Sequence, residues 1–347
     1  MKFSPLKIAQ VVSLTDQAKA IYFETAGNAT YQFSSGQYVT LKLNLNGEEL
    51  RRDYSIFTSP EDGNIGIGIK RVEGGKVSNF INDNFEAGQT IEVSEPQGRF
   101  CLPQEESEEY VFMACGSGIT PILSMVKSAL KKSGTKKVQL LFANKSKEDT
   151  MFFDEIIELA GAHQSLLNVT FFYSRNYSET EASDNVSFRE GRLHENFVQS
   201  MIEGGVFHRK AEYFICGPED LTVRMQKFLK RSMVAENHIH FELFTALKVE
   251  AATNTSTEAE VKVEMFGDEY AFKMDKGHYI LEEGLSKDVD MPFSCQGGVC
   301  TSCMCKVKSG EVDMQENFTL TDQEMDEGYI LTCISKPVSD VVELVFE

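Results

Sequence analysis

Short runs in which hydrophobic and polar residues alternate make up most of residues 1–105, and little of this region has the 3.6-residue period of an amphipathic helix. The clearest alternating runs are Lys7–Ser13, Ala20–Thr25 and Gln37–Leu43. Turn residues such as Asn46-Gly47 and Asp62-Gly63 separate such runs. Strands at this spacing predict a small antiparallel β-barrel over residues 1–105.

From residue 106 to residue 245 the pattern changes to buried strands that alternate with amphipathic helices. The predicted strands are Tyr110–Ala114, Val138–Ala143, Val169–Tyr173, Tyr213–Cys216 and His238–Phe244. The predicted helices are a segment that ends at Lys131, Thr150–Leu159, Leu193–Ile202 and Leu221–Arg231. This order predicts an α/β domain with a doubly wound parallel sheet, whose ligand binds at the carboxyl ends of the strands.

Residues 246–260 are polar and rich in Thr, which predicts a flexible linker. Residues 261–347 predict a third, α+β domain: a compact mixed sheet with one principal helix. Its expected strands are Val261–Met265, Tyr270–Met274, Met304–Lys308, Tyr329–Cys333 and Val341–Phe346. Its expected helices are Tyr279–Leu285 and Thr321–Asp326, the second beginning with a capping box of Thr321 and Glu324.

Composition and charge exclude several classes of function. The 347 residues are enough for two or three domains, and no apolar run reaches the roughly eighteen residues that span a bilayer. The net charge of −19 argues against nucleic acid and anionic membranes as partners. The N-terminus has no apolar signal segment, so we expect a cytoplasmic protein. Residues 259–347 have a net charge of −12, which serves solubility or steers the docking of a basic redox partner.

Four cysteines of the third domain have the C-x4-C-x2-C…C spacing of a plant-type 2Fe-2S site. They are Cys295, Cys300, Cys303 and Cys333. Iron in such clusters takes soft thiolate ligands, and Gly297 and Gly298 allow N–H groups to approach the cluster sulfurs. A zinc site would show two close pairs of ligands, disulfides are not expected without a secretory signal, and scattered core cysteines would not cluster this tightly. Cys305 is predicted to be a buried strand residue, not a ligand.

Two segments of the predicted barrel suit a flat, phosphate-bearing ligand. They read Arg52-Asp53-Tyr54-Ser55 and Gly74-Gly75-Lys76-Val77-Ser78. The first offers a guanidinium, an aromatic face and a hydroxyl on one strand, and the second is a Gly-Gly turn that opens a helix and can cradle a pyrophosphate. Each alone is more often a surface strand or an ordinary turn. Together they resemble the FAD-binding barrel of the ferredoxin–NADP reductase superfamily, which implies that both segments bind FAD.

Two segments of the α/β domain lie where a dinucleotide would bind. Gly116-Ser117-Gly118-Ile119-Thr120-Pro121 and Cys216-Gly217-Pro218 both follow buried strands. The first turn lacks the G-x-G-x-x-G fingerprint, and a generic tight turn is the alternative. Both segments resemble the nicotinamide domain of the same superfamily, which implies that Thr120 and Cys216 lie beside the nicotinamide. Ser174-Arg175 follows another strand, where an Arg suits a 2′-phosphate, so we expect NADPH with NADH as the alternative.

The closing strand of the α/β domain carries His238, His240, Glu242 and Phe244. Two His at strand spacing, without a cluster of carboxylates, predict structural residues and not a metal site. The superfamily has Phe-Glu-x-Phe at this place, which implies that Glu242 and Phe244 lie near the flavin edge.

Nearly the whole chain resembles the reductase subunits of multicomponent oxygenases, which end in a plant-type ferredoxin domain of the β-grasp fold. The run Gly47–Arg52, the cluster loop and Cys305-Lys306-Val307 most resemble the reductase subunits of phenylacetyl-CoA epoxidases, which act in phenylacetate catabolism. The resemblance implies electron flow from NAD(P)H through FAD and the 2Fe-2S cluster to a protein acceptor, here a di-iron monooxygenase. Tyr54, Ser55 and Cys216 are the expected catalytic residues. The alternatives are electron transfer to a desaturase, a P450 or a small carrier, and a flavin reductase with a regulatory cluster.

Overall fold

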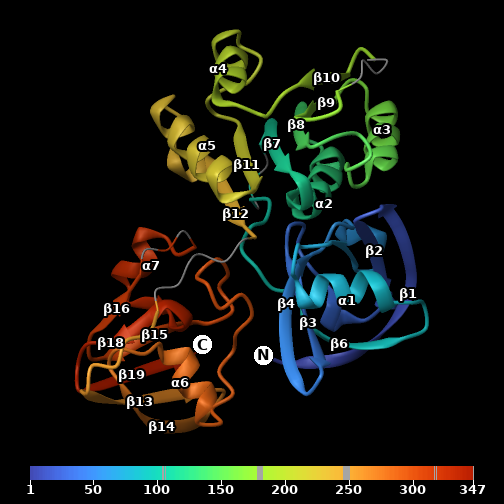
Figure 1. Ribbon diagram of the computed structural model, residues 1–347. Helices are drawn as coiled ribbons and strands as arrows, with labels where there is room; N and C mark the ends of the chain where they lie inside the picture. Colours follow the sequence, from blue (N-terminus) through green and yellow to red (C-terminus); the bar gives the residue numbers. More distant parts are fainter. Residues whose placement is uncertain are drawn as a thin grey trace. The chain divides into compact units, whose positions relative to one another are not determined.

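The computed structural model describes residues 1–103, 105, 107–177, 183–244, 251–315, 317 and 319–346. The chain divides into two compact units, one of residues 2–244 and one that follows Phe244 (Figure 1). The first unit contains the predicted barrel and the α/β domain, and the second is the C-terminal domain. No helix in the described part of the chain has the length and apolar character needed to cross a bilayer.

The N-terminal domain is a six-stranded antiparallel sheet with the order β4-β3-β6-β1-β2-β5. Its strands are β1 (Phe3–Thr15), β2 (Ala18–Phe23), β3 (Tyr38–Leu45), β4 (Glu48–Ser55), β5 (Gly66–Lys70) and β6 (Thr90–Ser94). A bridge between Ile56 and Ile67 joins the end of β4 to β5, which closes the sheet into the predicted barrel. Helix α1 (Lys76–Asn84) buries Val77 and Ile81 in the barrel core.

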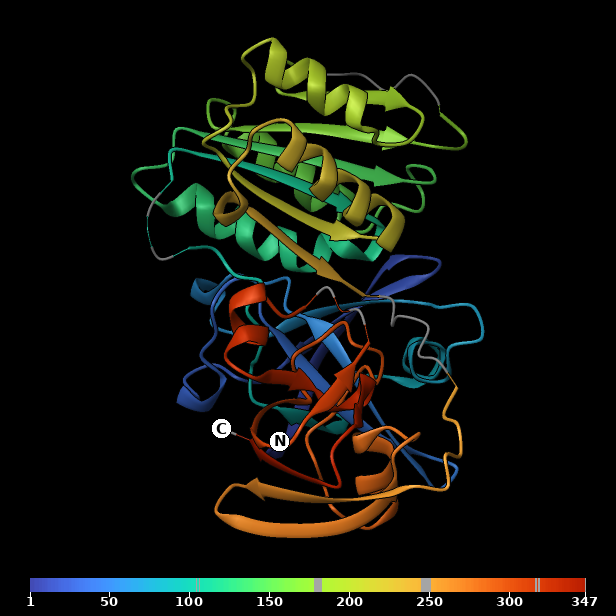
Figure 2. The same cartoon turned by 90° about the vertical axis from the view of Figure 1, so that its left-hand side faces the viewer.

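The α/β domain has six parallel strands in the order β10-β9-β8-β7-β11-β12. They are β7 (Glu109–Cys115), β8 (Lys137–Asn144), β9 (Leu167–Tyr173), β10 (Val186–Glu190), β11 (Glu212–Gly217) and β12 (Ile239–Leu243). The helices are α2 (Ile119–Lys131), α3 (Phe153–Ala162), α4 (Glu195–Glu203) and α5 (Glu219–Arg231). The first two helices cover one face and the last two the other (Figures 1 and 2). The strand order reverses at β7, so the ends of β7 and β11 form the switch point where such folds bind ligands.

The barrel and the α/β domain share one hydrophobic core, in which Ala18, Ala20 and Phe57 of the barrel pack with residues of α2 and α3. The ring of Phe57 lies between those of Tyr22 and Phe152, with centroid distances of 5.4 and 4.5 Å. Ser124 Oγ donates a hydrogen bond of 2.6 Å to the carbonyl of Thr58. These contacts hold the two domains as one body.

Gly68 of β5 lies at the centre of this contact. A Cβ atom at this position would stand 2.7 Å from Thr120 Cγ2, 3.0 Å from Met151 Cε and 3.1 Å from the ring of Phe152. Real Cβ atoms essentially never approach another heavy atom to less than 3.0 Å, so a side chain at position 68 would force Thr120 to shift.

The C-terminal domain has a five-stranded mixed sheet with the order β14-β13-β19-β15-β17 and a two-stranded sheet of β16 and β18. Its strands are β13 (Glu258–Met265), β14 (Asp268–Asp275), β15 (Met304–Ser309), β16 (Val312–Met314), β17 (Tyr329–Leu331), β18 (Ser335–Pro337) and β19 (Val341–Phe346). Its helices are α6 (Ile280–Ser286) and α7 (Asp322–Asp326), and α7 has the predicted capping box. Strands β13 and β19 are parallel and α6 packs on the domain core, as in a β-grasp fold.

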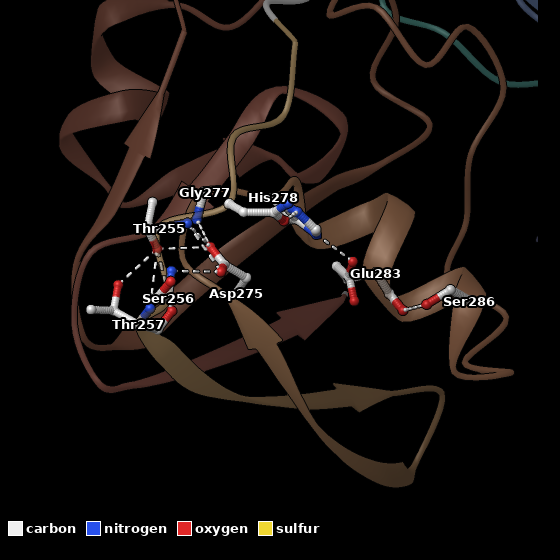
Figure 3. A network of polar contacts seen from close by, with 9 residues as sticks. Thr255, Ser256, Thr257, Asp275, Gly277, His278, Glu283 and Ser286 are labelled. Carbon is white, nitrogen blue, oxygen red and sulfur yellow. Dashed lines mark hydrogen bonds and ion pairs between the residues drawn. The ribbon is translucent and has the colours of Figure 1, made fainter.

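The segment before β13 is bound to this domain (Figure 3). The Asp275 carboxylate accepts hydrogen bonds from the backbone N–H groups of Thr255, Ser256 and Gly277, and these bonds hold its pKa well below the usual range. The ring of His278 bridges Asn254 and Glu283 at 2.9 and 2.6 Å. Of the linker predicted at 246–260, residues 246–250 lie outside the described residues. The part from Thr253 onward is hydrogen-bonded to the domain that it precedes. The residue numbers at which the three domains begin and end stay predictions.

We predict that Gly68→Ala destabilises the first unit by about 1–3 kcal/mol, because the new methyl group overpacks the contact with Thr120. Urea unfolding, followed by circular dichroism, measures this change. Gly161→Ala in α3 is the matched control, since a Cβ atom there meets nothing within 4 Å. The control should be as stable as the parent or slightly more stable. Equal stabilities of Gly68→Ala and the parent would contradict the assigned contact.

Candidate functional site

The four cysteines predicted as ligands come together in the C-terminal domain. Cys300 Sγ lies 3.2 Å from Cys295 Sγ, and the thiol of Cys333 is within hydrogen-bonding reach of the thiols of Cys295 and Cys303. The first three belong to the loop between α6 and β15. Cys333 does not lie on a strand, as the sequence predicted, but in the short 3-10 helix Thr332–Ile334 after β17.

Strand pairing explains the position of Cys333. Strand β17 pairs with β15, and Leu331 is opposite Met304. Directly after this pair, the N–H and the hydroxyl of Thr332 both donate to the carbonyl of Cys303 at 3.2 Å. The chain therefore turns at Thr332 and presents the next side chain, Cys333, beside Cys303.

The loop also aims backbone N–H groups at sulfur. The N–H of Gly297 donates to Cys295 Sγ at 3.4 Å, and the N–H of Val299 points to the same atom. Hydrogen bonds from the thiols of Cys300 and Cys333 and from these N–H groups lower the pKa of Cys295, which favours the thiolate that binds metal. Gly298 has a φ of +71°, and Thr319 Oγ1 donates to its carbonyl at 2.8 Å. The residues present therefore fit a ligand that offers sulfur acceptors.

The described ranges hold no group of three or more His, Cys, Asp or Glu side chains with the arrangement of a one-ion site. A two-iron cluster does not need one, because each iron takes two of the four thiolates. Cys305 is buried on β15, where burial raises its pKa, and it is a core residue as predicted.

A second site lies where the end of β4 meets β11 and β12. The hydroxyl of Ser55, the last residue of β4, is hydrogen-bonded to the carboxyl of Glu242 on β12, and Asp53 is close to the same carboxyl. Cys216, at the end of β11, is buried and near Glu242. Strand alternation puts Asp53 and Ser55 on one face of β4, and Arg52 and Tyr54 on the other. Burial raises the pKa of the half-buried Tyr54.

The carboxyl of Glu242 is unusual. Its Oε2 atom is buried and has no hydrogen-bond partner within the described part of the chain. Burial, together with the charge of Asp53, raises its pKa to about 8. A buried acid of this kind is neutral at pH 7 and can donate a proton or a hydrogen bond. A ligand with polar ring atoms would supply the missing partner, so this site fits a flavin.

The Gly74–Ser78 segment is placed as predicted, at the start of α1, but some of its side chains have other roles. Val77 packs in the barrel core, Ser78 Oγ accepts from the N–H of Val72, and Lys76 pairs with Glu48 at 2.6 Å. No side chain caps α1. The N–H of Gly75 donates to the carbonyl of Val72 at 2.9 Å, so the groups that this turn could offer to a phosphate are the backbone N–H groups of the first turn of α1, from Lys76 onward.

The two nucleotide segments meet at the switch point. A Cβ atom on Gly118 would lie 2.1 Å from the carbonyl oxygen of Cys216, so this glycine is required by the contact between the ends of β7 and β11. Gly116 has a φ of +56° with open space around it, which suits close approach of a ligand. Thr120 is buried and donates to the carbonyl of Ser117 at 3.0 Å. Gly217 and Pro218 follow at the end of β11.

Ser174 and Arg175 are exposed at the end of β9, where the N–H of Arg175 donates to the carbonyl of Lys145 at 2.7 Å. Sequence reasoning missed two further cations near the end of β7. Lys70, at the end of β5, and Arg192, before α4, both act on the thiol of Cys115 at the end of β7. Burial lowers the pKa of Lys70. Neither residue belongs to a local motif, and only the fold brings them together.

His238 and His240 are structural, as predicted. Both bind the carboxylate of Glu212 on the neighbouring strand, at 2.6 and 2.7 Å. The ring of His240 also stacks on that of Phe214, with centroids 4.5 Å apart. Phe244 is 40 % exposed at the end of the first unit.

Glu242→Gln tests the environment of this carboxyl. The folded-state pKa of about 8 lies above the ordinary 4.5, so the stability of the parent should fall as the pH rises from about 4.5 to 8. The amide of Gln does not ionise. Between pH 5 and pH 9 we therefore expect the free energy of unfolding of Glu242→Gln to fall by roughly 2–4 kcal/mol less than that of the parent. Urea unfolding of the flavin-free protein at several pH values measures this. Parallel pH profiles would contradict the assignment.

Three known domain families match consecutive parts of the chain. Models of an oxidoreductase FAD-binding domain, an oxidoreductase NAD-binding domain and a 2Fe-2S iron-sulfur cluster binding domain match residues 5–101, 112–228 and 263–338. A component of the 1,2-phenylacetyl-CoA epoxidase of Escherichia coli K12 is 33% identical, over 98% of this chain and 97% of its own. The ferredoxin reductase component of the 3-ketosteroid-9-alpha-monooxygenase of Mycolicibacterium smegmatis is 31% identical, over 99% and 96%.

Among solved structures, phthalate dioxygenase reductase superposes with a TM-score of 0.61. The match covers 99% of this chain and 98% of that one at 24% sequence identity, which shows a common fold.

Proposed function

The chain belongs to the family of electron-transfer reductases that carry an FAD-binding, an NAD-binding and a 2Fe-2S domain, and we propose that its partner is an oxygenase of the phenylacetyl-CoA epoxidase type. The observation that carries this proposal is the 33% identity to an epoxidase component over almost the full length of both chains. Relatives that serve other oxygenases have lower identity, 31% for the steroid enzyme and 26% for the reductase subunit of glycine betaine monooxygenase from Pseudomonas aeruginosa. Transfer to a desaturase, a P450 or a small carrier is the second candidate.

Bound FAD takes two electrons as hydride from NAD(P)H and can release them singly, and a 2Fe-2S cluster accepts one at a time. The chain's residues would bind and orient these groups. Arg52 and the backbone N–H groups at the start of α1, after Gly75, would hold the FAD phosphates. Tyr54 would cover the flavin ring, and Ser55 would hydrogen-bond at its edge.

The nucleotide would bind at the ends of β7 and β11. Gly116 leaves room for its phosphates, and Thr120 and Cys216 would flank the nicotinamide. The amino group of Lys70 and the guanidinium of Arg192 add positive charge near Cys115, at the end of β7. Arg175 would pair with a 2′-phosphate, so we propose NADPH as the physiological donor, with NADH as the alternative.

Glu242 would hold a proton beside the flavin. Its pKa of about 8 keeps the carboxyl largely protonated at pH 7. The hydrogen bond between this carboxyl and the hydroxyl of Ser55 holds the Glu242 side chain in position. This arrangement can supply a proton at Glu242 without admitting bulk water.

The four thiolates of Cys295, Cys300, Cys303 and Cys333 would hold the cluster in the C-terminal domain. These ligands require reduced thiols, which supports the cytoplasmic location that the sequence predicts. A steering role for the acidic C-terminal domain in partner docking stays a prediction.

Reconstitution with the purified oxygenase components of a phenylacetyl-CoA epoxidase tests the proposal. We expect NADPH and the wild-type chain to support conversion of phenylacetyl-CoA. Cys295→Ser should lose more than nine-tenths of this activity and its iron, yet keep NADPH-driven reduction of ferricyanide, which the flavin can serve directly.

Cys305→Ala is the matched control, because this nearby thiol is buried away from the site and should be dispensable for iron binding. Full output from Cys295→Ser would contradict the ligand assignment. A wild-type chain that reduces cytochrome c but yields no epoxidase product would favour the second candidate.

A further inference from the structure

Three Ser and Thr side chains are buried in the described part of the C-terminal domain: Ser294, Thr332 and Ser335, with exposures of 1%, 0% and 0%. Two of them have partners. Thr332 Oγ1 donates to the carbonyl of Cys303 at 3.2 Å, and Ser335 Oγ donates to the carbonyl of Leu331 at 2.8 Å. Ser294 Oγ has no hydrogen-bond partner within the described ranges. A buried hydroxyl without a partner costs about 1–3 kcal/mol, so this one calls for a partner that the protein does not supply.

The position of Ser294 limits what that partner is. It directly precedes Cys295, whose Sγ already receives the N–H of Gly297. Phe293, its other chain neighbour, is a buried apolar residue that offers no side-chain acceptor. The acceptors that the four-cysteine site brings to this place are sulfur atoms, as ligand thiolates or as the inorganic sulfides of a cluster.

We propose that the Ser294 hydroxyl donates a hydrogen bond to a sulfur of the 2Fe-2S site and thereby raises the reduction potential of the bound cluster. This inference rests on the proposed function of the four cysteines. Reduction adds one negative charge, which is shared by the sulfurs. A donor to sulfur therefore stabilises the reduced state more than the oxidised one.

Redox titration of the complete chain, followed by the EPR signal of the reduced cluster, tests the proposal. Ser294→Ala should lower the equilibrium constant for reduction about tenfold, which is about 59 mV for one electron. Ser335→Ala is the matched control, because it removes a buried hydroxyl that already donates its hydrogen bond to the carbonyl of Leu331. We expect Ser335→Ala to change the constant less than threefold.

Thermal unfolding of the cluster-free chains gives a second readout. Ser294→Ala should unfold at the same temperature as the parent or higher, since no hydrogen bond within the protein is lost. Ser335→Ala should unfold at a lower temperature. A wild-type potential for Ser294→Ala, or a loss of cluster-free stability equal to that of Ser335→Ala, would overturn the proposal.

The Cys295→Ser variant separates an error in the role of Ser294 from an error in the assignment of the four cysteines as cluster ligands. If the four cysteines do not hold the cluster, Cys295→Ser keeps its iron and its visible spectrum. If only the role of Ser294 is wrong, Cys295→Ser loses both, while Ser294→Ala keeps the wild-type potential.

Discussion

The contact of Gly68 with Thr120 is the constraint on which the first unit depends. Because β5 carries no side chain at this point, α2 can pack directly on the barrel, and Ser124 can bond to the backbone of Thr58. A similar approach, of Gly118 to the backbone of Cys216, joins the ends of β7 and β11. Together these contacts bring Ser55 from the barrel to Glu242 and Cys216 from the α/β domain. Backbone packing thus brings together side chains of the predicted flavin and nucleotide segments.

The C-terminal domain positions its site by different means. Pairing of β15 with β17 sets Cys303 beside Cys333, and positive-φ residues let the loop turn its N–H groups toward Cys295. The hydrogen bond from the N–H of Thr253 to the carbonyl of Gly277, and those from Thr255 and Ser256 to the Asp275 carboxylate, tie the preceding segment to this domain.

Much of this arrangement could be predicted from the sequence, because strand alternation and the spacing of cysteines are local signals. The barrel, the doubly wound sheet and the convergence of the four thiols are found as predicted. The short strands β10, β16 and β18 gave too little pattern, and the turn at Cys333 depends on a tertiary bond from Thr332. Lys70, Arg192 and the raised pKa of Glu242 arise from the fold alone. The side chain of Val77 packs in the barrel core, and a part for this residue in cofactor binding stays a prediction.

The central claim is that electrons pass from the nucleotide to the flavin and then to the four-cysteine site. Anaerobic stopped-flow absorbance of the purified holoprotein, mixed with NADPH or NADH, tests it most directly. If electrons take this path, the flavin absorbance bleaches first, the iron–sulfur bands then decrease, and NADPH reacts faster than NADH. Bleaching of the flavin while the iron–sulfur bands stay unchanged would contradict the internal electron path and favour a regulatory cluster.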